Sequence, residues 1–147
     1  YPLQVRWHAR RHELPLEGVD LLGVVSEEVL SEELARASLL AAPSLFGESF
    51  GMVLTRAFAS ATPVVASDIP GYAAVAGPET GVLVPPGDEE ALGAALVELL
   101  EDEPRRQRLG EQARQAAEPY SWTKIARRLV SIYEDLMNGR SVTREAA

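Results

Sequence analysis

The sequence predicts an α/β fold, an open parallel sheet with helices on its faces. Two observations lead to this prediction. Short apolar runs, such as 39–43 and 81–84, alternate with segments of about ten to twelve residues that have helical periodicity. These apolar runs are continuous, which is typical of strands that helices cover on both faces. Helices that connect parallel strands form right-handed crossovers, and we expect that topology here.

The composition narrows the class of protein. The chain has 147 residues, 46% apolar and 24% charged, as expected for one soluble globular domain with its own core. The absence of cysteine excludes disulfides and thiolate metal sites, and two histidines without acidic partners make a poor metal site. A net charge of −8 argues against a nucleic-acid partner, because such surfaces cluster positive charge. No apolar run reaches the roughly 18–20 residues that cross a bilayer, and we expect a cytoplasmic protein.

The first third of the chain predicts two strands and a helix. Residues 3–8 alternate apolar and polar side chains, which indicates a strand with one buried face. The charged segment 10–18 predicts a loop, and the apolar run 19–23 predicts a short strand that ends at a glycine. Ser26 can cap a helix that has glutamates in its first turn and ends near Ser38.

The middle of the chain predicts a strand, a helix and a second strand. The strand over 39–43 leads to a helix from Met52 to about Ser60, and the strand over 62–66 follows with its proline at the start. A turn over 67–71 ends this unit. The residues that we expect the helix to bury share helical spacing: Val53, Leu54, Ala57, Phe58 and Ala61.

The last part predicts a short helix, one strand and three long helices. The short helix covers 72–75 and the strand covers 81–84. Asp88 caps a helix over 89–100, and a more polar helix follows over 105–117. The inward residues expected of the first of these long helices are Leu92, Leu96, Leu99 and Leu100.

The final predicted helix is capped by Ser121 and has an apolar stripe that we expect to be buried. The stripe consists of Trp122, Ile125, Leu129, Ile132, Tyr133 and Leu136. We expect one domain over 1–138, incomplete at its N-terminus, and a flexible tail over 139–147. Because the chain begins with Tyr1 and not with methionine, we expect a fragment or a processed product.

The predicted topology also gives the place of a ligand site. In open parallel sheets ligands bind beyond the carboxyl ends of the strands, where the loops 23–26, 44–51 and 67–72 should converge. The polar entry Glu48-Ser49-Phe50-Gly51 leaves the first N–H groups of the following helix free and directs a partial positive charge outward. An anion, most often a phosphate, is the expected ligand. We predict that this stretch binds a nucleotide diphosphate.

Residues 43–71 resemble the donor-binding domain of the group 1 (GT4-like) retaining glycosyltransferases. These enzymes have the GT-B architecture of two Rossmann-like domains. Three further segments, 22–26, 81–88 and 120–122, resemble sequence motifs that are common in this family and occur in the same order. The likeness covers roughly residues 19–137. The resemblance implies a Rossmann-like domain, the C-terminal half of such an enzyme.

The activity that the resemblance implies is metal-independent glycosyl transfer with retention, from a UDP- or GDP-linked sugar and without a further cofactor. This chain would supply the donor-binding domain, would be inactive alone, and would lack the N-terminal acceptor-binding domain. Glu48 would hold the hydroxyls of the donor sugar, and backbone groups near Val24 and Val25 would meet the base. The remaining residues implied at the nucleotide are Ser49, Phe50, Gly51, Met52, Val53 and Arg56.

Arg56 departs from the family pattern, which has a second glutamate eight positions after the residue that Glu48 matches. Eight helical residues span about 12 Å, roughly the reach from a donor sugar to a ribose. A glutamate there would accept hydrogen bonds from the ribose, whereas arginine has only donors. It could donate to a ribose oxygen, pair with a phosphate, neutralise Glu48 in the empty protein, or be a solvated surface charge. The family's glycine after this helix is Ala61, which costs on the order of 1 kcal/mol if the backbone there is left-handed.

Two other readings stay open. One is a degenerate, non-catalytic module that keeps the fold for nucleotide binding or interaction, and the other, less well supported, is a sugar epimerase of the same architecture. Beyond the nucleotide-sugar donor, we expect pairing of two copies through an exposed strand edge, because a partial sheet leaves such an edge open. Peripheral membrane contact is a further expectation for the intact enzyme.

Overall fold

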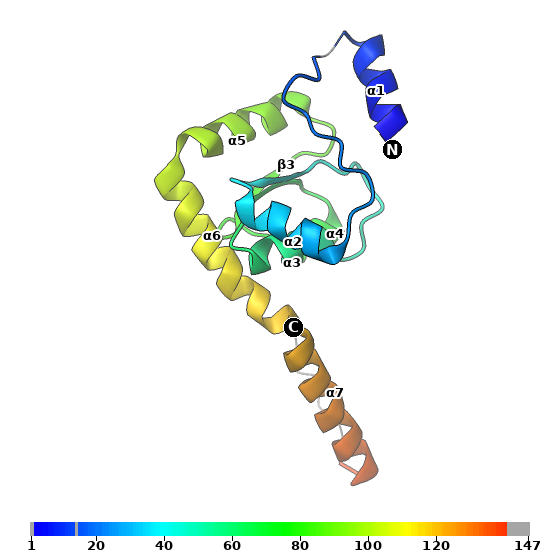
Figure 1. The fold of residues 1–147 in the computed structure, drawn as a ribbon. Helices are drawn as coiled ribbons and strands as arrows, with labels where there is room; N and C mark the ends of the chain where they lie inside the picture. Colours follow the sequence, from blue (N-terminus) through cyan, green and yellow to red (C-terminus); the bar gives the residue numbers. More distant parts are fainter. Residues whose placement is uncertain (1, 14, 141–147) are drawn as a thin grey trace. The chain divides into compact units, whose positions relative to one another are not determined.

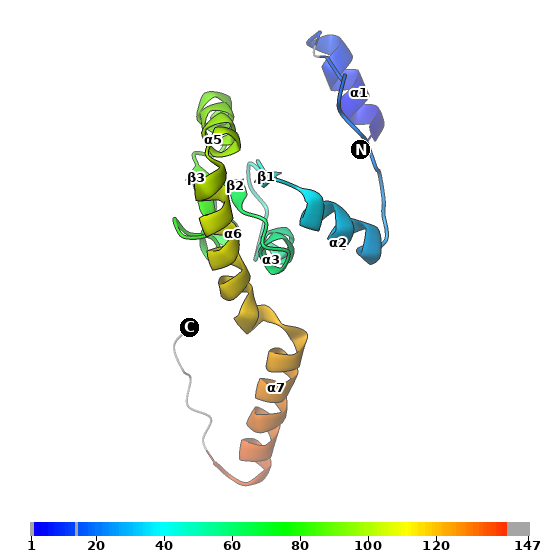
Figure 2. The same cartoon turned by 60° about the vertical axis from the view of Figure 1, so that its left-hand side comes forward.

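The computed structural model describes residues 2–13 and 15–140 of the chain. The chain divides into two compact units, Tyr1–Glu33 and Leu34–Ala147, and each is considered by itself. Figure 1 and Figure 2 show the elements of both units. The second unit contains the sheet and most of the helices.

The first unit begins with helix α1 (Pro2–Arg11), where the alternation over 3–8 predicted a strand. That prediction is wrong. Proline is well suited to the first position of a helix, since its missing N–H would have no helical acceptor there. Val5 and the buried Ala9 stand four residues apart, so they share a face of the helix. The alternation over six residues was too short to distinguish the two-residue period of a strand from the 3.6-residue period of a helix.

The predicted strand over 19–23 is also wrong. Within residues 2–13 and 15–140 this segment pairs with no strand, and the Val19 N–H instead donates to the Leu16 carbonyl in a turn at 3.1 Å. An apolar run becomes a strand only when another strand satisfies its backbone groups. Helix α2 (Glu27–Arg36) confirms the helix predicted from Ser26, whose Oγ accepts the Val29 N–H at 3.4 Å.

The sheet of the second unit has three parallel strands in the order β1-β2-β3, and it confirms the predicted α/β class. Its strands are β1 (Leu40–Ala42), β2 (Val64–Ser67) and β3 (Gly81–Val84). Strand β2 lies in the middle and is buried along its whole length. Ala41 of the edge strand β1 is exposed, so helices do not cover both faces of that strand as predicted.

Among the described residues, six helical segments follow β1 in the second unit. The bounds of the five α-helices agree with the predictions within a few residues, whereas the 3₁₀ turn was not predicted. The six segments are α3 (Met52–Ala59), α4 (Pro70–Ala73), α5 (Glu89–Glu101), α6 (Glu103–Ala117), the 3₁₀ turn η1 (Glu118–Tyr120) and α7 (Trp122–Met137). The predicted caps are confirmed. The side chain of Asp88 accepts the Ala91 N–H at 2.9 Å, and that of Ser121 accepts the Lys124 N–H at 3.3 Å.

The core of the second unit lies between the sheet and helices α5 and α6. Its centre consists of Val65, Val84, Ala95, Leu99 and Leu109. Leu54 and Phe58 of α3 are fully buried, as their spacing predicted. Leu100, which we expected to face inward, is 53% exposed, because α5 directs Ala95 and Leu99 at the core and the next residue along points elsewhere.

The expected burial of the apolar stripe on α7 is wrong. No residue of α7 is buried among those described, and Trp122 is 81% exposed. The helical spacing of the stripe was right, but the main packing of α7 is against the short η1 turn, and its first residues line the groove beside α3. Residues 141–147, most of the predicted flexible tail, lie outside the described residues.

Helix α3 ends in a motif that requires a left-handed residue, and that residue is Ala61 at φ 58°. The Ala61 N–H donates to the Phe58 carbonyl and the Thr62 N–H donates to the Ala57 carbonyl, both at 2.9 Å. This pair of hydrogen bonds defines a Schellman cap, where glycine is the usual residue. The Ala61 carbonyl also lies so close to Gly110 of α6 that a Cβ at position 110 would overlap it.

We predict that Ala61→Gly raises the free energy of unfolding by about 1 kcal/mol, because glycine adopts the left-handed conformation without steric cost. Urea unfolding followed by circular dichroism measures this change. Ala94→Gly is the matched control, since the exposed middle of α5 should lose about 1 kcal/mol from the same substitution. A lower free energy of unfolding in Ala61→Gly would show that the left-handed backbone of Ala61 is not strained.

Candidate functional site: the entry to helix α3

Two loops meet at the carboxyl ends of β1 and β2. The Ser44 Oγ and the Tyr72 hydroxyl share a hydrogen bond of 2.9 Å between these loops. Gly71 lies against the Glu48 backbone so closely that a Cβ there would overlap the Glu48 carbonyl oxygen. Two of the three predicted loops therefore converge, as the topology required. The third loop, 23–26, belongs to the other unit, and its place beside them stays a prediction.

Gly51 turns the chain into α3. It has left-handed backbone angles, φ 74° and ψ 44°, and its carbonyl accepts the Leu54 N–H at 2.9 Å. A Cβ at Gly51 would lie 2.9 Å from a ring carbon of Tyr72, which is 3% exposed and held in place. Both the backbone angles and the lack of space make glycine necessary here.

Glu48 folds back onto the entry of the helix. Its Oε1 accepts the Gly51 N–H at 3.1 Å and the Phe50 N–H at 3.4 Å. These two hydrogen bonds, chiefly that from Gly51, hold the pKa of Glu48 below its ordinary value. The N–H groups of Met52 and Val53, at the first two positions of α3, have no acceptor within the helix. The entry thus already holds one anionic group, its own carboxylate.

The other predicted residues are spread over different environments. Phe50 is 40% exposed and makes an edge-to-face contact with Tyr120, with ring centroids 5.4 Å apart. Ser49 is exposed beside it, and Met52 is 58% exposed. Val24 is exposed in the first unit, and its predicted contact with a base therefore stays a prediction, as does that of Val25.

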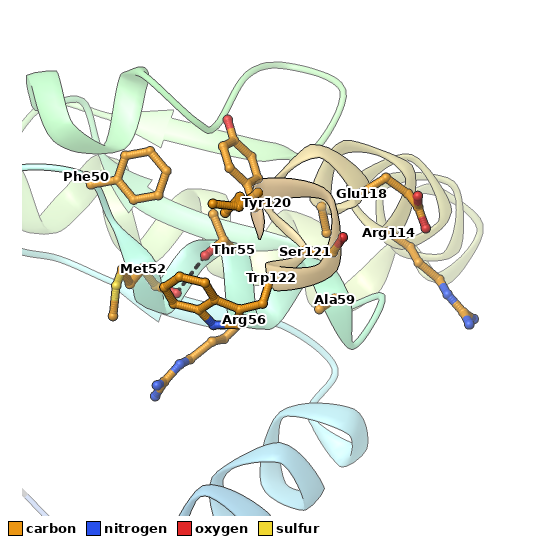
Figure 3. A pocket seen from close by; sticks show the side chains of 12 residues that line it. Phe50, Met52, Thr55, Arg56, Ala59, Arg114, Glu118, Tyr120, Ser121 and Trp122 are labelled. Carbon is orange, nitrogen blue, oxygen red and sulfur yellow. Dashed lines mark hydrogen bonds between the residues drawn. The ribbon is translucent and has the colours of Figure 1, made fainter. Parts of the chain in front are cut away.

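A groove beside α3 has a volume of about 610 Å³ and was not found by sequence reasoning. Figure 3 shows its lining, in which side chains of α3 face those of α6, η1 and the start of α7. The lining residues are Phe50, Met52, Thr55, Arg56, Ala59, Arg114, Ala117, Glu118, Tyr120, Ser121, Trp122 and Ile125. The sequence indicated segment 120–122 as a family motif, with Ser121 as a helix cap and Trp122 in a buried stripe, but gave no sign that Tyr120 and Trp122 line a groove.

Arg56 is half-buried and lines this groove from α3, one turn after Met52. In Figure 3 its guanidinium group extends from the helix and points away from that of Arg114. The lining of the groove therefore combines aromatic side chains with two arginines and one glutamate, Glu118. Across the part of the chain that the structure describes, no cluster of three or more histidine or acidic side chains could hold a metal ion. No helix in the same part is long and apolar enough to cross a membrane.

The fold and the site together define an α/β domain in which the N-terminus of α3 lies at the carboxyl edge of a parallel sheet. Residues 4–116 match the family described as glycosyl transferases group 1. The chain belongs to this family.

Curated relatives agree with the family. A phosphatidyl-myo-inositol mannosyltransferase from Mycobacterium leprae is 36% identical over 133 residues, which are 90% of this chain and 36% of the relative. A D-inositol 3-phosphate glycosyltransferase from Corynebacterium glutamicum is 43% identical over 110 residues, or 74% of this chain and 26% of the relative. The chain thus spans about a third of the length of these relatives, or less.

Solved structures agree with the fold. A sucrose-phosphate synthase from Thermosynechococcus elongatus superposes with a TM-score of 0.82 at 30% identity, covering 92% of this chain and 34% of the other. An Anabaena protein solved in complex with UDP has a TM-score of 0.80 at 22% identity, again over 92% of this chain and 37% of the other. The family match confirms the predicted group 1 glycosyltransferase family, and the superpositions together with the parallel sheet confirm the Rossmann-like α/β fold.

We predict that Glu48→Gln lowers stability near neutral pH and that the difference disappears in acid. The folded-state pKa of Glu48 is lowered, so the ionised carboxylate contributes stability above its unfolded pKa of roughly 4.3 and this contribution is lost as the pH falls through the lowered value. Urea unfolding at several pH values measures the difference between the two proteins.

The control is Glu111→Gln, which removes an exposed glutamate from the middle of α6. A difference between wild type and Glu48→Gln that stays constant from neutral pH into acid would contradict the role of the charge.

Proposed function

We propose that the entry of α3 binds the diphosphate of a nucleotide-sugar donor, and that this chain is the donor-binding domain of a retaining, metal-independent glycosyltransferase. The observation that carries the proposal is the left-handed Gly51 entry at the carboxyl edge of the sheet, inside the segment that matches the family. The Anabaena neighbour solved with UDP, and with UDP-glucose in a second structure, supports a nucleotide-sugar ligand for this fold.

The chemistry follows from where negative charge develops. When the bond between sugar and phosphate breaks, charge grows on the leaving diphosphate. The N–H groups of Met52 and Val53, at the positive end of the α3 dipole, would stabilise that charge as fixed donors. A positively charged side chain such as Arg56 can offset part of the remaining charge on the diphosphate.

Glu48 would have to change its contacts when the donor binds. Its carboxylate occupies the Gly51 and Phe50 N–H groups, and a phosphate oxygen cannot use the same donors at the same time. A diphosphate would displace the carboxylate, which could then accept hydrogen bonds from the hydroxyls of the donor sugar. The acceptor-binding part, the base contacts at Val24 and Val25, and a cytoplasmic location belong to the same proposal for the whole enzyme.

Arg56 favours a second candidate, a non-catalytic module of the same fold. An arginine cannot accept hydrogen bonds from a ribose, as the family's second glutamate does. Such a module would keep the helix entry and the groove but would have lost a donor contact. The two candidates differ in what a change at position 56 does to nucleotide binding.

We predict that the chain binds uridine or guanosine diphosphate weakly, with a dissociation constant of about 1 mM, and that Gly51→Ala abolishes the binding. A Cβ at position 51 meets the Tyr72 ring and strains the left-handed backbone, which displaces the donor N–H groups. Calorimetric titration with each diphosphate measures the binding.

Gly77→Ala is the matched control, because a Cβ there meets nothing within 4 Å and the backbone is not left-handed. The absence of heat with both diphosphates at millimolar concentration would contradict the proposed site.

We predict that Arg56→Glu weakens diphosphate binding by at least about tenfold, since it replaces a cation at the groove with an anion. The control is Arg108→Glu, the same change of charge at an exposed position of α6. Stronger binding in Arg56→Glu would instead identify a lost carboxylate contact and favour the non-catalytic module.

A further inference from the structure

Tyr72 of α4 contacts both ends of the loop over 44–51, which leads from β1 into α3. Its hydroxyl shares a hydrogen bond of 2.9 Å with the Oγ of Ser44, where this loop begins. One edge of its ring lies against Gly51, where the loop ends, since a Cβ there would lie 2.9 Å from Cδ1 and 3.4 Å from Cε1 of the ring. A single side chain from α4 therefore holds the two ends of the 44–51 loop.

Tyr72 is itself fixed in the interior. Its exposed fraction is 3%, and its N–H donates to the Ile69 carbonyl at 2.9 Å. A side chain with so little exposed surface cannot be a contact for a ligand, so Tyr72 can influence a ligand only through the loop that it contacts. Both contacts lie inside the chain, and they do not depend on what covers its outer surface.

The part of the 44–51 loop between its ends is exposed. Phe46 is 83% exposed, and Gly47 is exposed with left-handed backbone angles, φ 86°. An exposed segment of this kind gains little from burial and is free to shift when its ends are released. The position of Gly51 therefore depends on the contacts that α4 makes with the loop, and Tyr72 makes two of them.

We propose that Tyr72 is a positioning residue for the diphosphate site at the entry of α3, and that its hydroxyl raises the affinity of that site. This inference rests on the proposed function of the entry. N–H donors that already have the orientation of the complex bind an anion more tightly than donors that must be ordered on binding. The hydrogen bond between Ser44 and Tyr72 supplies this order, and its effect reaches the donors through Gly51.

Tyr72→Phe tests the proposal, because it keeps the ring against Gly51 and removes only the hydroxyl. The dissociation constant for a nucleoside diphosphate should rise about three- to tenfold, as the loss of one neutral hydrogen bond predicts. Ser44→Ala removes the same hydrogen bond from the other side and should have the same effect. NMR titrations of the full 147-residue chain with uridine diphosphate and with guanosine diphosphate measure both changes.

The double variant separates this role from a direct contact between Ser44 and the ligand. If both changes act through the shared hydrogen bond, Ser44→Ala combined with Tyr72→Phe will bind no more weakly than either single variant. In the ligand-free protein, Ser44→Ala should also shift the amide resonances of residues 51–53, and it should leave them in place in a Tyr72→Phe background. A residue that only stabilised the core would not produce this dependence.

Thr62→Val is the matched control. It also removes one hydroxyl and one buried hydrogen bond, that from the Thr62 Oγ1 to the Leu34 carbonyl at 2.7 Å. Thr62 follows the C-terminal end of α3, whereas the diphosphate site is at its N-terminal end. Thr62→Val should therefore lower the free energy of unfolding and leave the dissociation constants for both diphosphates unchanged.

Two results would overturn the role of Tyr72 and leave the proposed function standing. One is an unchanged dissociation constant in Tyr72→Phe when the wild type binds a diphosphate. The other is a double variant in which the two losses of affinity multiply, because Ser44 and Tyr72 would then act independently. The absence of binding by the wild type with both diphosphates would overturn the proposed function and the role of Tyr72 together.

Discussion

The close approach of the loops after β1 and β2 is the constraint on which the site depends. Position 71 has no room for a Cβ beside the Glu48 backbone, and Gly51 has none beside the Tyr72 ring. The hydrogen bond between Ser44 and Tyr72 fixes the same two loops to each other. Parallel strands bring these loops to one edge, but only the two glycines let the backbones come this close. The direction of α3, and therefore of its first N–H groups, follows from this contact.

The helix entry that results is suited to an anion, and the chain supplies one itself. The Glu48 carboxylate satisfies two N–H groups and has a lowered pKa for that reason. A diphosphate that binds there would replace the Glu48 carboxylate at these N–H groups. Displacing the carboxylate costs binding free energy, and a neutral residue at position 48 would avoid that cost. This arrangement explains why weak binding is expected from the chain alone, since a donor sugar and an acceptor domain would add contacts in the whole enzyme.

The sequence predicted the second unit well because its signals are local. Strand β3 has the predicted bounds, and the caps of α5 and α7 form as expected at Asp88 and Ser121. Prediction failed where burial depends on a neighbouring element. Among the described residues the apolar run 19–23 pairs with no strand, and no residue in the stripe of α7 is fully buried. The groove beside α3 could not be predicted either, since its walls come from helices about sixty residues apart in sequence.

The most direct test of the central claim is an NMR titration of the ¹⁵N-labelled chain with uridine diphosphate. Amide resonances report on the backbone N–H groups that are proposed to bind the phosphates. If the entry of α3 is the site, the largest shifts will fall on residues 50–53, and Glu48→Gln will increase the affinity by removing the competing carboxylate. Shifts confined to other parts of the sheet edge, or none at millimolar diphosphate, would contradict the account.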